Sequence, residues 1–541
     1  MAAAETLSAR ASLEEGAPLL SATEPASRES SPAPLPERST KKKPWKFLVF
    51  LVFVLITIVD VGAFLAEPPK TRVFEANICL RWYEENDPSK VGNDGAVPEA
   101  LCKIDEVQQK LAMIFGWQDT FDAIPGLLLA IPFGALADKW GRKWIFVASL
   151  VGLQLNSAWI LFICYFRSLP LQLTWFSSAF YLLGGGPVVA SALGITMISD
   201  IAPPDQRTNI FLYLTASVLI AEMLAPIMAS KLMETGMWLP LLLALAIQQV
   251  GVTVGIFFPE TLHLRDLPEP RDGEDASIEL QAKDEGHGLK IQLKHFKSAL
   301  LLLTSDVQLA LVVALFVVNR LGRQALTLLI RYASKRYNWE IAKAAYLLSF
   351  RAATNLVAVA VFIPIVNIIL LRYLRLPVHW ADLWLTRGSL LITAAGFLAI
   401  ALAFEPAILI FGLLVFNLGT GSSAAMRSVA LHVVGGQSSP DVGKLMSLIA
   451  VSENIGVMLA GPLLNEAFTK GMDLKGAWLG LPFFGVFVLY VLATIVSCTV
   501  SVKDRDMAYV EVATDEDEAD VVNGRSSALE DGPSVTHTTE Q

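Results

Sequence analysis

Long apolar runs separated by short polar breaks dominate the chain between residues 46 and 501. A helix needs about 20 mostly apolar residues to cross a bilayer, and twelve runs approach or exceed this length. The runs lie at 46–66, 113–137, 144–166, 171–198, 209–233, 239–258, 306–330, 341–371, 388–404, 406–433, 445–467 and 477–501. This pattern predicts an all-α membrane protein with twelve transmembrane helices.

A charged segment at 260–305 divides the runs into two groups of six. We therefore expect an N-terminal six-helix bundle at 45–259 and a C-terminal six-helix bundle at 306–501. Residues 1–44 and the acidic segment 502–541 have the composition of disordered tails, because they contain too few apolar residues to build a core.

Basic residues predict how the chain lies across the membrane. Lys41, Lys42 and Lys43 precede the first run, and further short basic groups follow the second and eighth runs. Such groups favour the cytosolic side. Both tails and the segment 260–305 are therefore expected to be cytosolic, and residues 67–110 to form the long external loop.

An internal repeat supports the division into two similar halves. Gly184–Gly186 precede Ala225–Pro226 by nearly the interval that separates Gly419–Gly421 from Gly461–Pro462. The first element falls in the fourth run of each half and the second in the fifth. The repeat predicts two pseudo-symmetric bundles.

Composition narrows the possible functions. The chain is 54% hydrophobic and 17% charged, and its net charge of -9 lies mostly in the acidic C-terminal segment. A nearly neutral, apolar body argues against nucleic-acid binding. The spacing of the 4 cysteines and 6 histidines matches no metal site. Cys79 and Cys102 share the external loop and are expected to form a disulfide.

The segment Gly134-Ala-Leu-Ala-Asp138-Lys-Trp-Gly141-Arg142-Lys143 joins the second and third runs. Gly134 would let a neighbouring helix approach, Asp138 could face the positive end of that helix, and Gly141 would permit a tight turn. Arg142 and Lys143 add cytosolic charge. The segment resembles the signature loop of the major facilitator superfamily.

Other segments extend the resemblance across about 45–501. Asp200 and Arg207 resemble the family's charge pairs after helix four, and Pro259-Glu260-Thr261 resembles the end of its helix six. Ala221 to Ser230 occupies the place of a glycine-rich antiporter motif, with alanines and serine replacing the glycines. The stretch from Cys102 through Val107-Gln108, Phe121-Asp122 and Ile124-Pro125-Gly126 to Gly134 most resembles fungal facilitators related to the proton-coupled folate transporters.

Ionisable residues inside apolar runs each cost roughly 2.5–3.5 kcal/mol at the bilayer centre, so they need a function or a partner. Desolvation favours the neutral form of a carboxylic acid, which makes Asp60, Glu222 and Glu453 candidates for proton coupling. The candidates for the substrate cavity are Arg320, Arg323, Arg351 and Arg427. The alternative for each residue is a static ion pair between helices.

Two further groups lie near the ends of runs. Asp119 and Asp122 lie in the outer third of the second run, where a static ion pair is the favoured interpretation. Arg331, Lys335 and Arg336 follow the seventh run and are expected in an external loop.

The resemblance implies a secondary active transporter rather than an enzyme. It would be a monomer in the lipid bilayer and carry a small-molecule substrate, driven by a proton gradient without a cofactor. The favoured function is proton-coupled efflux of a small organic molecule such as a fungal secondary metabolite. The alternatives are proton-coupled uptake of a small organic anion or nutrient, and a sensor that does not transport.

The membrane in which the protein resides has two candidates. The plasma membrane is favoured, and the vacuolar membrane is the alternative. Glu15-Gly-Ala-Pro-Leu19-Leu20 fits an acidic dileucine sorting pattern, which resembles signals that route membrane proteins to vacuoles.

Overall fold

The computed structural model describes residues 45–93, 95–203, 206–262, 307–434 and 442–500. The predictions for the two tails, the dileucine pattern and most of the segment 260–305 fall outside these residues. The body that begins at Trp45 is described here by itself.

The described residues contain 12 helical spans long and apolar enough to cross a membrane, as the sequence predicts. The first six come from these elements: α1 (Trp45–Asn86), α2 (Asp105–Trp140), α3 (Arg142–Tyr165), a 3-10 segment (Leu171–Leu182) continued by α4 (Gly186–Ile201), α5 (Arg207–Met233) and α6 (Trp238–Phe257). Their outward surfaces carry large exposed apolar side chains such as Leu128 and Tyr213, as lipid contact requires.

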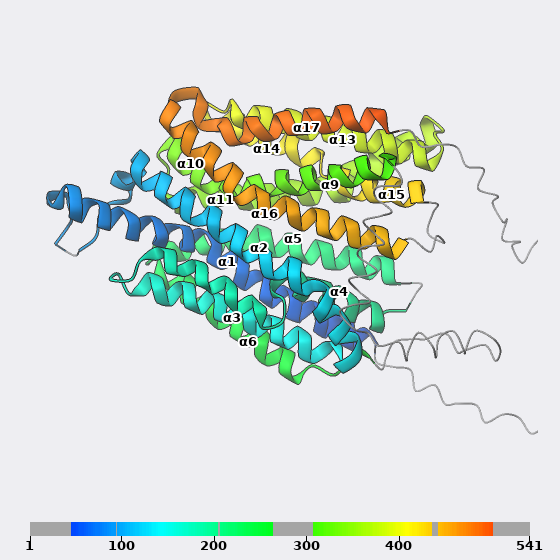
Figure 1. The fold of residues 1–541 in the computed structure, drawn as a ribbon, viewed down its shortest axis with the longest axis horizontal. Coiled ribbons are helices and arrows are strands. Elements are labelled where there is room, and N and C mark those ends of the chain that lie inside the picture. The colour runs from blue at the N-terminus through cyan, green and yellow to red at the C-terminus, as the bar shows by residue number, and fades with distance from the viewer. Residues whose placement is uncertain (1–44, 94, 204–205, 263–306, 435–441, 501–541) are drawn as a thin grey trace, which may run out of the picture. The chain divides into compact units, whose positions relative to one another are not determined.

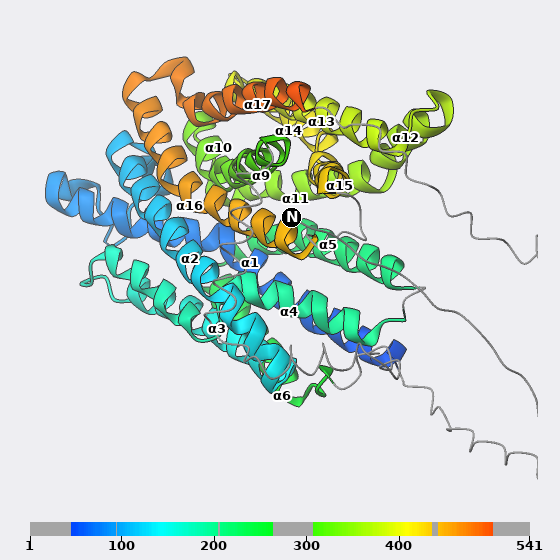
Figure 2. The same cartoon turned by 45° about the vertical axis from the view of Figure 1, so that its right-hand side comes forward.

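The other six spans begin at α9. They are α9 (Val307–Ala325) with α10 (Leu329–Tyr337), α11 (Ile341–Val357) with α12 (Ile363–Ile368), α13 (Val378–Ala401), α14 (Pro406–Leu418) with α15 (Ser422–Val434), α16 (Val442–Leu474), and α17 (Leu481–Thr499). Figures 1 and 2 show these helices running alongside the first six. Helix α2 packs on α16, and α5 packs on α11, and these two pairs form the most extensive contacts between the bundles.

The glycines of the internal repeat break the fourth and tenth spans at equivalent places. A Cβ on Gly184 would lie 2.4 Å from the backbone N of Ser149, and one on Gly419 would lie 2.1 Å from Thr393 Oγ1. Ser149 Oγ donates to Gly184 O at 2.6 Å, and Thr393 Oγ1 donates to Gly419 O at 3.3 Å. The close approach of a neighbouring helix explains glycine at both positions.

Two element boundaries differ most from the sequence prediction. Residues 67–86 continue α1 instead of starting a loop, because Phe74, Ile78 and Cys79 are buried among residues of α2 and α3. Helix α13 begins at Val378 rather than residue 388. Arg387 can lie inside this helix because its Nε donates to Ser497 O at 3.2 Å, which replaces a hydrogen bond to water.

Candidate functional site

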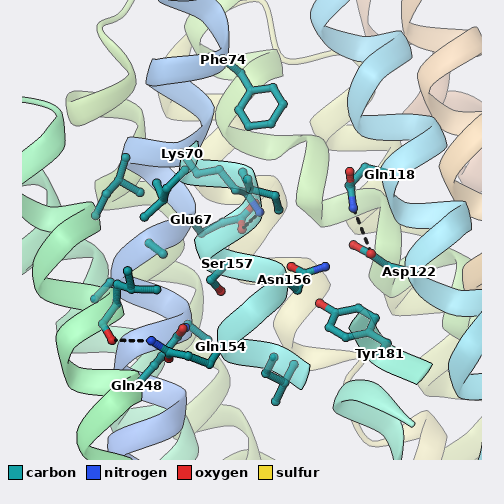
Figure 3. Close-up of a pocket in the computed structure, with 18 of the residues that line it drawn as sticks. Glu67, Lys70, Phe74, Gln118, Asp122, Gln154, Asn156, Ser157, Tyr181 and Gln248 are labelled. Atoms are coloured by element: carbon teal, nitrogen blue, oxygen red, sulfur yellow. Dashed lines mark hydrogen bonds and ion pairs between the residues drawn. The ribbon is translucent and has the colours of Figure 1, made fainter. Parts of the chain in front are cut away.

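A cavity of about 320 Å³ lies among α1, α2, α3, the 3-10 segment, α6 and the last third of the seventh span (Figure 3). Its size is typical of small-molecule sites, which also combine an apolar wall with a few polar groups. The polar and charged side chains in its wall are Glu67, Lys70, Gln118, Asp119, Asp122, Gln154, Asn156, Ser157, Gln248, Thr327 and Arg331.

Two cations of the cavity are held by the protein itself. Lys70 Nζ lies 2.7 Å from Glu67 Oε2, one turn away on α1. Arg331 donates from Nη1 to Asn465 Oδ1 at 2.9 Å and is only 4% exposed. Both cations lie near the ring of Phe115, at 5.6 and 4.5 Å from its centroid.

Three of these residues lie elsewhere than the sequence predicts. Glu67 and Lys70 belong to α1 and not to an external loop, because the helix continues through them. Arg331 lies inside the seventh span and not in a loop, because Asn465 and Phe115 supply partners for its charge. The Glu67–Lys70 spacing of three residues, typical of a helical ion pair, is the signal that could have found the first two.

Asp119 and Asp122 also differ from expectation, because both line the cavity and neither forms an ion pair with another described residue. The Asp122 Oδ1 atom accepts hydrogen bonds from Gln118 Nε2 at 2.9 Å and from Ser178 Oγ. Neutral donors therefore stabilise the Asp122 carboxylate, while Asp119 has no described hydrogen bond.

Glu222 on α5 and Arg351 on α11 form an ion pair between the two bundles. The sequence identified both residues, and the structure brings them together. Their side chains are 13% and 25% exposed, so the pair is largely removed from solvent. Breaking such a pair leaves a costly unpaired charge.

The remaining intramembrane candidates are arranged differently. Arg427 Nη2 lies 2.8 Å from Glu453 Oε1 within the second bundle. Arg320 and Arg323 are exposed on α9, and neither makes a hydrogen bond or ion pair with another described side chain. Asp60, half-buried on α1, likewise has no partner among the residues that the structure describes.

The segment between α2 and α3, at what we term the loop end of the bundles, is held by Glu260. The Glu260 carboxylate accepts from the backbone N–H groups of Arg142, at 2.9 Å, and Lys143, at 3.2 Å. A Cβ on Gly141, whose φ is 108°, would lie 2.4 Å from Glu260 Oε2. Only glycine therefore fits this turn without displacing the carboxylate. This role of Glu260 was not predicted from the sequence.

Arg142 joins two acids at the loop end. Its Nη2 lies 3.1 Å from Asp138 Oδ1, and its Nε lies 2.6 Å from Asp200 Oδ2. Asp138 therefore pairs with the first residue of α3. Gly134 has no neighbouring atom within 4 Å of an added Cβ, so the expected close approach of a helix is not seen. Arg207 begins α5, but its side chain lies outside the described atoms.

The ionisation of Glu260 predicts a pH effect on stability. Partial burial would raise the pKa of this carboxyl, but hydrogen bonds from the backbone N–H groups of Leu262, Arg142, Thr261 and Lys143 outweigh it and hold the pKa below 4.5. The resulting stabilisation is present above pH 4.5 and is lost as the pH falls through the lowered value. Glu260→Gln should lower the melting temperature at pH 7 and reduce its dependence on pH below 4.5. Identical acid profiles for the two proteins in thermal unfolding would contradict this role.

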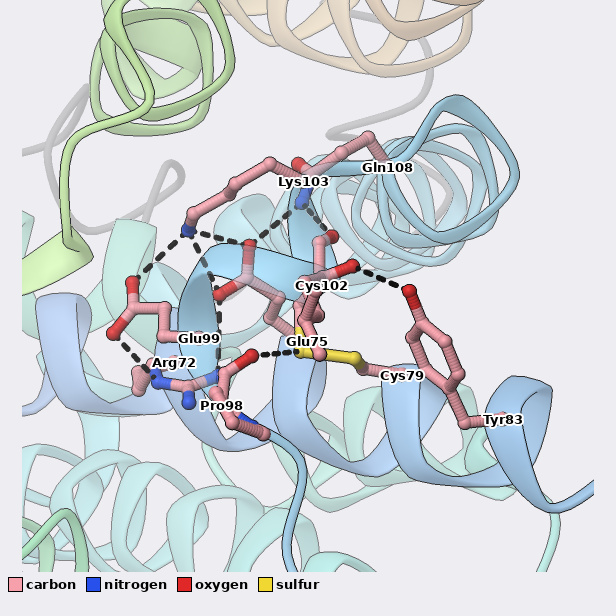
Figure 4. The surroundings of a disulfide bond; sticks show 10 residues. Arg72, Glu75, Cys79, Tyr83, Pro98, Glu99, Cys102, Lys103 and Gln108 are labelled. Atoms are coloured by element: carbon pink, nitrogen blue, oxygen red, sulfur yellow. Dashed lines mark hydrogen bonds and ion pairs between the residues drawn. A yellow bond between two sulfur atoms is a disulfide. The ribbon is translucent and has the colours of Figure 1, made fainter. Parts of the chain in front are cut away.

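The opposite end, which we term the disulfide end, is cross-linked. Cys79 on α1 and Cys102 in the 3-10 turn Glu99–Lys103 form a disulfide (Figure 4). Beside it, Lys103 Nζ lies 2.7 Å from Glu75 Oε1 and 2.9 Å from Glu99 Oε1. Arg72 Nε pairs with Glu99 Oε2 at 2.9 Å. This network fixes the turn against α1.

The same turn reaches the second bundle. Glu99 Oε1 accepts from the backbone N–H of Ile341, at the start of α11, at 2.7 Å. Lys335 Nζ donates to Lys103 O and pairs with Asp105 Oδ1, each at 2.5 Å. These bonds close the disulfide end between the bundles. They also place Lys335 at the interface, where the sequence analysis expected only a loop.

Removing the cross-link should loosen this closure. In the chain-entropy model, a disulfide that closes a loop of this length stabilises a protein by about 3 kcal/mol. Replacing both Cys79 and Cys102 by serine should therefore lower the melting temperature in detergent. Mass spectrometry without reduction should find the linked peptides in the wild type, whereas two free thiols would refute the bond.

Comparisons with known proteins agree with this architecture. The family model of the Major Facilitator Superfamily matches residues 109–461. The MFS efflux pump atnC of Emericella nidulans is 36% identical over 79% of this chain and 82% of its own length. The efflux pump ustT of Aspergillus flavus is 28% identical over 83% and 87%.

A solved structure supports the same fold. The human organic anion transporter MFSD10 superposes with a TM-score of 0.53 at 18% identity, covering 84% of this chain and 99% of its own. Family proteins of this kind are multi-pass membrane transporters that move small molecules and are not enzymes. The matched domain, the fungal relatives and the paired six-span bundles show that this chain belongs to the major facilitator superfamily.

Proposed function

We propose that this transporter exports a small organic molecule, such as a fungal secondary metabolite, and is driven by the proton gradient. Two relatives are named efflux pumps, which supports the direction. The observation that carries the coupling mechanism is the ion pair between Glu222 and Arg351, because it joins the two bundles within the membrane.

Protonation of Glu222 would weaken this pair. A neutral acid loses most of its attraction for the guanidinium, so proton binding favours separation of α5 from α11. Asp60, a carboxylate without a described partner, is the second candidate carrier, and Glu453 is the third because it pairs only within its own bundle. Arg351 then has a coupling role, while Arg320, Arg323 and Arg427 remain candidates for substrate contact.

The structure is closed at the disulfide end, which suits a state that binds its substrate from the loop end. Bonds from Glu99 and Lys335 join the bundles at the disulfide end. Basic flanks favour a cytosolic position for the loop end, and an exporter in this state would accept its substrate there. We place the protein in the plasma membrane as a monomer, with the vacuolar membrane as the alternative.

Proton-coupled uptake of a small organic anion or nutrient is the second candidate. It is favoured by the alanines and serine that replace the antiporter glycines in α5, between Ala221 and Ser230. An untargeted comparison of metabolites in cells and medium separates the two. Loss of the gene should leave a compound inside the cells if the protein exports it. Failure to take up an added compound would indicate import, and unchanged fluxes with altered signalling would indicate a sensor.

Asp138→Asn should reduce transport about tenfold while surface abundance stays near normal. The Asp138 side chain is 52% exposed, so its charge adds little to folding, but its pair with Arg142 changes when the loop end opens or closes. A change of about 1.4 kcal/mol in the free-energy difference between two conformational states changes the ratio of their populations tenfold. Immunoblotting and flux in the same cells test this. Loss of the protein itself would show that the residue is structural.

A further inference from the structure

The charges around the cavity do not balance. Three carboxylates, those of Glu67, Asp119 and Asp122, line the wall together with two cations, Lys70 and Arg331. Lys70 pairs with Glu67. Arg331 donates to the neutral amide of Asn465 and lies over the ring of Phe115, and its charge attracts both Asp119 and Glu67. The described wall therefore has one negative charge in excess and no cation free to bind an anion.

Asp119 is the acid of this wall that no described hydrogen-bond donor reaches. Asp122 receives hydrogen bonds from Gln118 and Ser178, and Glu67 has its lysine, whereas no described donor reaches Asp119. The charge of Arg331 offsets part of the cost of taking the Asp119 carboxylate out of water, but Arg331 is shared with Glu67 and lies beyond hydrogen-bond distance of Asp119. The site is thus incomplete without a group that supplies positive charge.

Gln118 gives an independent indication of the same chemistry. Its side chain is 7% exposed, and its Nε2 donates to the Asp122 carboxylate at 2.9 Å, which fixes the orientation of the amide. The opposite atom, Oε1, has no hydrogen-bond partner. Figure 3 shows Gln118 turned toward Asp122 on the cavity side of α2. The wall therefore has an unused acceptor as well as an unused negative charge.

We propose that this cavity binds the protonated amine of an organic substrate, with Asp119 as its counter-ion. The aromatic rings of Phe74, Phe115 and Tyr181 supply apolar surface for the rest of the molecule. A metal ion fits less well, since no described cluster of three or more His, Cys, Asp or Glu residues could hold one. This inference rests on the proposed transport of a small organic molecule and specifies its chemical class.

Binding to the purified full-length protein in lipid nanodiscs tests the inference without any gradient. The probe is phenethylammonium, and the matched probes are neutral 2-phenylethanol and anionic 3-phenylpropionate. Cys164→Ser and Cys498→Ser remove the free thiols, and Ser157→Cys places a reporter in the cavity wall. The rate of alkylation by N-ethylmaleimide reports occupancy, and thermal unfolding of the unmodified chain reports binding independently.

Phenethylammonium should slow alkylation and raise the melting temperature, whereas the other two probes should do neither at equal concentration. Asp119→Asn should weaken its binding about tenfold or more, as expected for loss of a hydrogen bond to a charged group. Glu466→Gln is the matched control, because Glu466 is an exposed acid 3.6 Å from Lys470. Equal effects of all three probes, or full binding by Asp119→Asn, would overturn the inference. If Asp119 is instead protonated and neutral, the three probes should have equal effects. Efflux measured in cells tests the proposed function separately from this binding experiment.

Discussion

Replacing Gly461 by alanine should reduce transport about tenfold or more while leaving the protein in the membrane. Helices α2 and α16 meet across the bundles at this glycine, and an added Cβ would lie 2.4 Å from Gly116 O and 3.0 Å from Thr120 Oγ1. The first contact is with backbone, so the helices must move apart. Overpacking of this kind costs about 1–3 kcal/mol. We expect the cost to fall on the state closed at the disulfide end, because the two helices meet there.

Gly485 on α17 provides the matched control, since nothing lies within 4 Å of a Cβ built there. Gly485→Ala should transport normally. Flux and surface abundance measured for both variants give the test. Normal flux through Gly461→Ala would show that this contact does not need to close during the cycle.

Glu222→Gln should abolish transport driven by a pH gradient but preserve exchange of substrate across the membrane without a gradient. Glutamine keeps the shape of the side chain but cannot gain or lose the proton. Because Arg351 would lose its partner while only 25% exposed, the single change should also destabilise the protein, by less than the roughly 3–5 kcal/mol that breaking a fully buried pair costs.

The double variant Glu222→Gln, Arg351→Gln separates coupling from stability. Removing both charges should restore much of the abundance without restoring the response to pH. Asp60→Asn, measured in the same vesicles, tests the other carboxylate. If both Glu222→Gln and Asp60→Asn accumulate substrate normally in response to pH, neither residue carries the coupling proton.

The twelve spans were predictable because lipid imposes a length on every apolar helix. The same rule misled at residues 67–86 and at Arg331, where charged residues within a span look like the end of it. Their partners explain the difference. Arg331 is paired with Asn465, which lies 134 residues away, and no local pattern reveals such a pair.

In the candidate site, too, the sequence reveals single residues but not which of them come together. Residue type alone singled out Glu222 and Arg351, because each is an ionisable group in an apolar run. Their pairing requires the contact of α5 with α11, which only the packing of the bundles provides. The cavity was missed as a unit because Glu67, Gln118 and Arg331 come from three helices and share no sequence pattern.

Transport into inside-out membrane vesicles tests the central claim most directly. The substrate is the compound that cells lacking the protein retain, and the imposed condition is an acidic lumen with a neutral exterior. A proton-driven exporter should accumulate the compound inside these vesicles, and a protonophore should abolish the accumulation. Accumulation that ignores the pH gradient, or that occurs only in right-side-out vesicles, would contradict proton-coupled export.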